Sequence, residues 1–195
     1  MIEAVLTAFI AAVFIENVVT VRMLGTDLAL YSPAKPRAAF TLGLIMMVLS
    51  VLTAASAYAV NLLWVRLDLT VLNLLTTLVL TILWLSLIRL LCGRLSPGLS
   101  ALVQTWSPSL LVSSAVLGIG LIYSQSQTLS FGAALGQAAA SGLGFMLLML
   151  IYSGLNERME QARASQPRAL RGLPSLLIAA GLICLAFMGF NGMIF

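Results

Sequence analysis

Residues 14–27, FIENVVTVRMLGTD, combine a strongly apolar stretch with two acids, an amide and a guanidinium. In a helix that begins near Ala4, Glu16 lies about 18 Å along the axis, roughly at the centre of a bilayer. A charged side chain there costs at least about 2.5–3 kcal/mol, so its default interpretation is functional. Asn17 is adjacent and Thr20 is one turn on, on the same face. These residues predict a midplane polar site; the alternative is a protonated Glu16 that helps helices to pack.

The rest of this stretch leaves a second question open. Arg22 lies about 240° around the helix from Glu16, so we expect it to extend to the headgroups instead. Asp27 follows Gly25 and Thr26. In a straight helix Asp27 marks the end of the span, whereas a break at Gly25 would place it inside the protein, where free backbone groups line a cavity.

A similar combination recurs in the second half of the chain, in WSPSLLVSSAVLGIG (106–120). Pro108 favours a helix start, where its missing N–H is not needed. Ser113 and Ser114 then lie in the first turns, where their hydroxyls either bond the backbone or line a site. Gly118 and Gly120 interrupt this span as Gly25 interrupts the first, although glycine is common in membrane helices.

A third pattern has the character of a packing motif. Gly132 and Gly136 have GxxxG spacing within GAALGQAAASGLG, which permits close helix packing. The same surface is a candidate contact with another subunit. Gln137 is a weaker candidate for a hydrogen bond between helices.

Composition indicates the elements that must position these residues. The chain is 61% hydrophobic and 8% charged, with mean hydropathy +1.09, and a soluble domain carries about 25% charged residues. Spans of about 20 apolar residues cross a membrane as helices. We therefore predict an all-α integral membrane protein whose spans cover 4–25, 39–62, 69–92, 107–124, 131–153 and 174–194. Residues 156–172 form the one predicted amphipathic surface segment.

The basic residues predict the orientation of these spans. Nine of the ten lie in or beside the segments that follow spans one, three and five, and Arg66 alone lies on the other side. The positive-inside rule places the richer side in the cytoplasm. Both termini would then face outward from a bacterial or archaeal cytoplasmic (inner) membrane, in contact with lipid. The first apolar run follows only Met1, Ile2 and Glu3, so we expect a retained span instead of a cleaved signal peptide.

Several function classes find no support in the sequence. It has no His, no nucleotide-binding glycine loop, no hydrolase triad and no zinc spacing. Cys92 and Cys184 are about 90 residues apart and outside any CxxC pair, so we expect neither a disulfide nor a metal motif. A net charge of +4 is too diffuse for a nucleic-acid surface. We expect no catalytic residues, and at most one component of a translocase.

Three spans in each half give residues 1–97 and 98–195 opposite orientations within one membrane domain. This arrangement is typical of inverted repeats, which place a site near the midplane between two broken helices. An unrelated set of glycine-containing helices is the alternative.

The motifs FIEN (14–17), LG (24–25), AVLG (115–118), NERM (156–159), LRGLP (170–174) and AAGLICLAFMGFNG (179–192) occur in the order found in a known family. The chain resembles the Rnf/Nqr membrane subunits over its whole length, and is most similar to the E-type subunit of the sodium-pumping quinone reductase (Nqr) and the A-type subunit of the Rnf complex. The resemblance implies six helices in two inverted halves with the first helix of each half broken. It also implies pairing with a homologous membrane subunit, other subunits that carry flavins, and Na⁺ or H⁺ translocation.

The resemblance further implies that each broken helix supplies one cysteine to a [2Fe–2S] cluster shared by two subunits. Here the position two residues after LG is Asp27, and the position before AVLG is Ser114. Fe–S clusters are held overwhelmingly by thiolates. We therefore expect no cofactor bound by this chain, with Asp27 at most an unusual ligand and any [2Fe–2S] or flavin in partner subunits.

Three hypotheses follow from this departure. The chain is one subunit of a redox-driven ion pump, or a transporter in which Asp27, Glu16 and Ser114 line a cation or small-solute path, or a structural subunit. A carboxylate suits the transporter hypothesis because hard cations take oxygen ligands.

Overall fold

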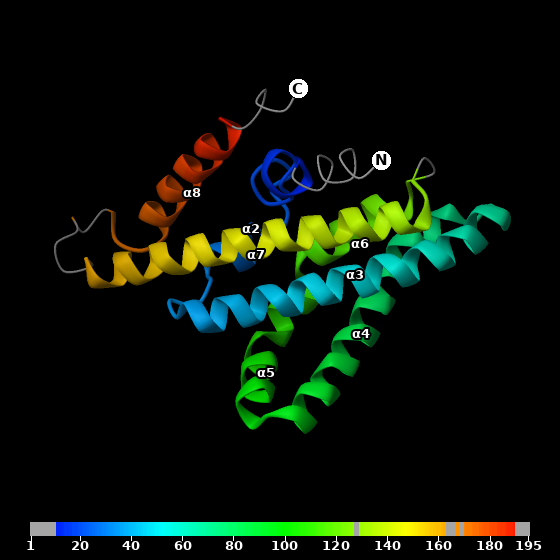
Figure 1. Ribbon diagram of the computed structural model, residues 1–195, viewed down its shortest axis with the longest axis horizontal. Coiled ribbons are helices and arrows are strands. Elements are labelled where there is room, and N and C mark those ends of the chain that lie inside the picture. Colours follow the sequence, from blue (N-terminus) through cyan, green and yellow to red (C-terminus); the bar gives the residue numbers. More distant parts are fainter. Residues whose placement is uncertain (1–10, 127–128, 163–166, 168–169, 190–195) are drawn as a thin grey trace.

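The computed structural model describes residues 11–126, 129–162, 167 and 170–189, and these ranges contain helices and no strand (Figure 1). Two short elements come first, the π-helix η1 and the α-helix α2, and a single 3₁₀ turn, η2, precedes α4. The elements are η1 (Ala11–Ile15), α2 (Thr26–Leu30), α3 (Pro36–Arg66), η2 (Thr70–Leu72), α4 (Asn73–Leu95), α5 (Pro97–Val112), α6 (Ser114–Ser124), α7 (Phe131–Gln161) and α8 (Leu173–Met188).

Three of the described helices are long and apolar enough to cross a membrane, at 36–66, 70–94 and 131–161. A fourth candidate span is the pair α5 and α6, bent by 55° at Ser113. The helix α8 is apolar but shorter. The prediction of an all-α membrane protein is thus confirmed, and of the six predicted spans those at 4–25 and 174–194 lie partly outside the described residues.

The first predicted span is not one continuous helix, which agrees with the broken first helix that the family resemblance implies. Helical structure ends after η1, and residues 16–25 form turns before α2 begins at Thr26. The Asn17 side chain explains part of this change, since its amide donates to the Val13 carbonyl and accepts from the Val19 N–H. These bonds offer the backbone an alternative to the helical ladder.

The start of the fourth span is also earlier than predicted. The helix α5 begins with Pro97, and Pro108 lies in its interior instead of at a helix start. Pro108 has no N–H for the Gln104 carbonyl, but the Ser107 hydroxyl donates to that carbonyl at 3.1 Å. The break comes at Ser113, whose backbone is extended, so Gly118 and Gly120 lie within α6 and do not interrupt the span.

The two longest helices, α3 and α7, run antiparallel along each other at the centre of the molecule (Figure 1). Each carries a glycine and, four residues later, a methionine that meets the glycine of the other helix. A Cβ on Gly43 would touch Met146, and a Cβ on Gly142 would lie 2.9 Å from Met47 Cα. This reciprocal contact gives the helix pair a local two-fold character.

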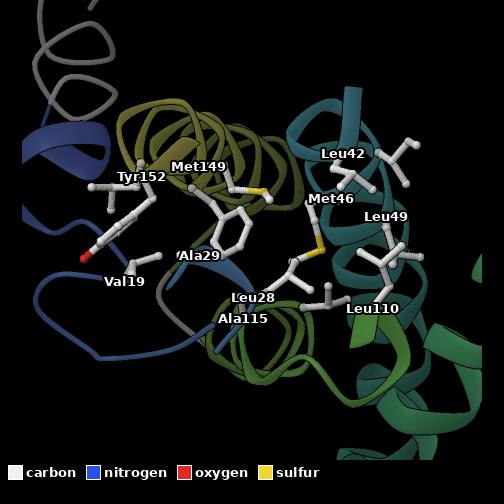
Figure 2. Packing of buried hydrophobic residues seen from close by; sticks show 14 of the residues in the cluster. Val19, Leu28, Ala29, Leu42, Met46, Leu49, Leu110, Ala115, Met149 and Tyr152 are labelled. Atoms are coloured by element: carbon white, nitrogen blue, oxygen red, sulfur yellow. The ribbon is translucent and has the colours of Figure 1, made fainter. Parts of the chain in front are cut away.

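The hydrophobic core fills the space beside this pair. Leu28 and Ala29 of α2 are almost fully buried between α3, α7 and the α5–α6 region, and Figure 2 shows Leu28 next to Met46. The short helix α2 is therefore held by tertiary packing, because five residues form no stable helix alone.

The first half of the helix α4, residues 73–84, buries polar side chains and exposes apolar ones. Asn73, Thr77 and Thr81 are buried at helical spacing. Asn73 donates to Asn61 of α3, which donates to the Ser124 carbonyl at the end of α6. In lipid, such hydrogen bonds hold helices together, while the apolar face meets hydrocarbon.

Candidate functional site: the junction of the two broken segments

The two interruptions of the chain, at residues 16–25 and at Ser113, meet in space. The Gly25 N–H donates a hydrogen bond to Ser114 Oγ at 2.9 Å, across 89 residues of sequence. Gly25 directly precedes α2 and Ser114 is the first residue of α6. The bond therefore joins the starts of two helices, one from each half of the chain, and we refer to this contact as the junction.

Gly25 is required at the junction for two reasons. Its φ of +75° is in the left-handed region, which costs a residue with a Cβ about 1–2 kcal/mol. A Cβ there would also lie 2.6 Å from Cε2 of Phe145 and 2.7 Å from Cβ of Ala115. Only glycine lets the first segment approach α6 and α7 so closely.

The residues before and after this bond continue the contact. A Cβ on Gly118 would collide with Cδ1 of Leu24, so Gly118 provides the space in which Leu24 lies. The pairs Leu24–Gly25 and Ala115–Gly118 thus pack against each other, although about 90 residues separate them. The glycine that the sequence suggested as a break is instead a packing position.

The first break is buried on its inner side. Asn17 is fully buried with both of its side-chain groups bonded, and a Cβ on Gly144 of α7 would lie 2.7 Å from its Nδ2 atom. Val18 and Val19 are buried next to it. Asn17 is therefore a structural residue that closes the open backbone, and its polar character alone did not distinguish this role from a functional one.

The charged residues of the same segment lie on its outer side. Glu16, Arg22 and Asp27 are exposed, as is Ser114. Thr20 is buried, so the predicted face shared by Glu16 and Thr20 is wrong, because the chain is not helical between them.

The breaks also contain hydroxyl groups without partners. Thr20 Oγ1 and Ser113 Oγ, one in each break, are buried and make no hydrogen bond in the part of the chain that the structure describes, and Thr53 Oγ1 of α3 is a third such group. Thr26, half-buried, has its hydroxyl 3.5 Å from the Met23 carbonyl. Most buried hydroxyls in folded proteins have a hydrogen-bond partner, so these three are exceptions to that rule.

The predicted packing motif on α7 faces away from the other helices. A Cβ on Gly132 or Gly136 would meet no atom within 4 Å, so no described helix of this chain packs closely there. A contact with another subunit at this surface stays a prediction. Gln137 is half-buried and makes no side-chain hydrogen bond within the described residues.

The side-chain donors in and next to the junction are oxygen atoms. The Ser114 hydroxyl already accepts from the Gly25 N–H, and Asp27, two residues after Gly25 in the chain, has an exposed carboxylate. Among the described residues no three Cys, Asp or Glu side chains gather as metal ligands. Cys92 lies in the last turn of α4 and Cys184 in α8, in helices other than those of the junction. Oxygen donors of this kind suit hard cations.

The residues that the sequence did not single out are Asn61 and Asn73. Their position within apolar runs could have identified them, since an asparagine in a membrane helix needs a hydrogen-bond partner. Its partner could not be deduced without the packing of α3 against α4 and α6.

Comparison with known proteins identifies relatives over almost the full chain. The family model described as Rnf-Nqr subunit, membrane protein, matches residues 5–194. The chain is 30% identical to the A-type subunit of the Na(+)-translocating ferredoxin:NAD(+) oxidoreductase complex of Acetobacterium woodii, covering 94% of this chain and 95% of that protein. It is 30% and 32% identical to the A-type subunits of the ion-translocating oxidoreductase complexes of Rhodobacter capsulatus and of Edwardsiella ictaluri, with 97% of each chain covered.

Proposed function

The chain belongs to the Rnf-Nqr family of membrane-protein subunits, and from that membership we propose that it is a membrane subunit of an ion-translocating oxidoreductase complex. The full-length similarity to the A-type subunits of such complexes is the observation that carries the proposal. By analogy with the relative from Acetobacterium woodii, Na⁺ is the first candidate for the ion, and H⁺ is the second. Its expected partner in the membrane is a homologous subunit.

We further propose that the chain has six spans in two inverted halves. The antiparallel α3–α7 pair, with its reciprocal glycine and methionine contacts, supports this arrangement. So do the two broken segments, each of which precedes one of these long helices. In the proposed orientation both termini face outward, which agrees with the distribution of basic residues.

The [2Fe–2S] cluster implied by the family does not fit the residues of this chain. Its two ligand positions hold Asp27 and Ser114, and the Ser114 hydroxyl is engaged by the Gly25 N–H. A hydroxyl and a carboxylate are poor substitutes for thiolates. We therefore propose that this subunit takes part in ion translocation without ligating a cluster.

Iron content and visible absorption of the purified complex test this proposal. We expect the purified chain with its partners to contain no iron that depends on Asp27, so that Asp27→Ala leaves iron and absorption unchanged. Loss of a cluster signal in Asp27→Ala would show that this chain does bind one.

The oxygen donors of the junction favour a second candidate, a transporter that works without electron transfer. Sodium uptake into vesicles that contain the complex distinguishes the two. Uptake that requires the electron donor supports the oxidoreductase function, whereas uptake by the chain alone in liposomes, without any donor, supports the transporter.

A further inference from the structure

The helix α5 presents polar side chains on its exposed face. After the first turn, its exposed positions recur every three or four residues, so they form one stripe along the helix: Ala101, Gln104, Thr105, Pro108, Ser109 and Val112. The opposite face, with Val103 and Leu110, is buried. We refer to the three polar members, Gln104, Thr105 and Ser109, as the α5 stripe.

The neighbouring helix α4 has the opposite arrangement. In its first half, residues 73–84, the buried positions are an asparagine and two threonines, and the exposed positions are Leu, Val and Ile, including Leu75 and Leu83. Lipid hydrocarbon can cover such an apolar face without leaving a polar group unpaired. The α5 stripe also lies on a candidate membrane span, the bent pair of α5 and α6. The exposed face of α5 can therefore be compared with the exposed face of α4.

Contact with lipid hydrocarbon is unfavourable for the polar side chains of the α5 stripe. Thr105 Oγ1 donates to the Ala101 carbonyl, but the Gln104 amide and the Ser109 hydroxyl make no side-chain hydrogen bond within the described residues. An amide without a hydrogen-bond partner is unfavourable in an apolar medium. Water satisfies such groups at no cost.

The α5 stripe leads to the junction. After Val112 the chain turns at Ser113, and Ser114, also exposed, binds the Gly25 N–H. Asp27 follows Gly25 by two residues and is exposed. The exposed charged side chains of residues 16–27 are Glu16, Arg22 and Asp27, two acids and one base, so these residues carry a net charge of −1.

We propose that the α5 stripe lines a water-filled approach through which a monovalent cation reaches Asp27 at the junction. Hydroxyl and amide groups keep the ion hydrated along the helix, and the carboxylate is the first charged oxygen that it meets. The identity of the cation as the transported ion rests on the proposed function. The presence of the approach does not, because it concerns access of water to named side chains.

Cysteine accessibility in native membranes tests this inference on the assembled complex. In a chain with Cys92→Ser and Cys184→Ala, single variants Gln104→Cys and Ser109→Cys are compared with Leu75→Cys and Leu83→Cys on the exposed face of α4. The reagents are a cationic trimethylammonium and an anionic sulfonate methanethiosulfonate, applied to vesicles of both orientations. A thiol reacts as its thiolate, which forms in water and not in hydrocarbon, so we expect labelling of the stripe at least about tenfold faster than of α4.

The charge of the reagent tests the role of Asp27. For each variant the quantity compared is the labelling rate with the cationic reagent divided by the rate with the anionic reagent. We expect this ratio to be higher at Ser109→Cys than at Ser96→Cys, which lies outside the stripe. Adding Asp27→Asn should bring the two ratios together. Gln104→Cys serves as the second position if Ser109→Cys fails to insert.

Two outcomes would overturn the inference. Stripe cysteines that label as slowly as those of α4 would mean that a protein partner or lipid covers this face. A cation preference that persists in Asp27→Asn would mean that Asp27 is not the end of the path. Since labelling needs no turnover, it succeeds or fails separately from the redox and transport assays.

Discussion

Replacement of Gly25 by alanine should destabilise the protein at the junction of its two broken segments. The left-handed φ costs about 1–2 kcal/mol for a residue with a Cβ. The new methyl group would lie 2.6 Å from the buried Phe145 ring and 2.7 Å from Ala115. Overpacking of this kind costs typically 1–3 kcal/mol, so the expected total loss is about 2–5 kcal/mol.

The measurement is thermal unfolding of the purified protein in mild detergent. A thiol-reactive fluorophore reports the exposure of Cys92 and Cys184, both of which are partly buried in the folded state. For a protein of this length each kcal/mol corresponds to roughly 2–4 °C in the midpoint. Gly136→Ala is the matched control, because a Cβ there meets no atom within 4 Å and alanine is favoured over glycine in a helix interior by about 1 kcal/mol.

A double variant separates the two causes of the loss. Phe145→Leu removes the closest ring atom, so Gly25→Ala should cost less in that background than in the native chain. The left-handed backbone would account for the part that remains. If Gly25→Ala melts at the same temperature as Gly136→Ala, the described conformation of the junction is wrong.

The remaining predictions concern other contacts and use the same unfolding assay. Ser114→Ala leaves the Gly25 N–H without its acceptor and should cost about 1–3 kcal/mol, whereas Ser86→Ala on the exposed face of α4 should change little. Asn61→Leu should cost about 1–3 kcal/mol, because it leaves Asn73 and the Ser124 carbonyl unpaired; an unchanged midpoint would count against the α3–α4–α6 connection. Gly118→Ala should cost less than Gly25→Ala, since its methyl group meets only the flexible end of Leu24; a larger loss would contradict this ranking.

Single residues of the junction could be predicted from the sequence, but the contact between them could not. The sequence indicated Gly25, Asp27, Ser114 and Gly118 as candidates, from polar and glycine residues inside apolar runs. The hydrogen bond between Gly25 and Ser114 joins residues 89 positions apart. No local pattern encodes such a partner, because periodicity describes only neighbours on the same helix.

Other expectations failed where a side chain competed with the backbone. Glu16 and Thr20 have the spacing of a shared helical face, but Asn17 bonds to Val13 and Val19 and the helix ends before that face can form. Pro108 has the signature of a helix start, but Ser107 occupies the carbonyl that the proline leaves free, and α5 continues through it.

The sequence by itself determined that the chain is helical and lies in a membrane, because too few charged residues are present to cover a globule in water. It also determined which apolar runs supply the long helices, since their length matches the thickness of a bilayer. Tertiary structure alone decided where those helices break and which side chains meet at the breaks. The physical reason is that a backbone freed from the helical ladder takes its partners from whatever packs against it, and here these are Ser114, Phe145 and Ala115 from the second half of the chain.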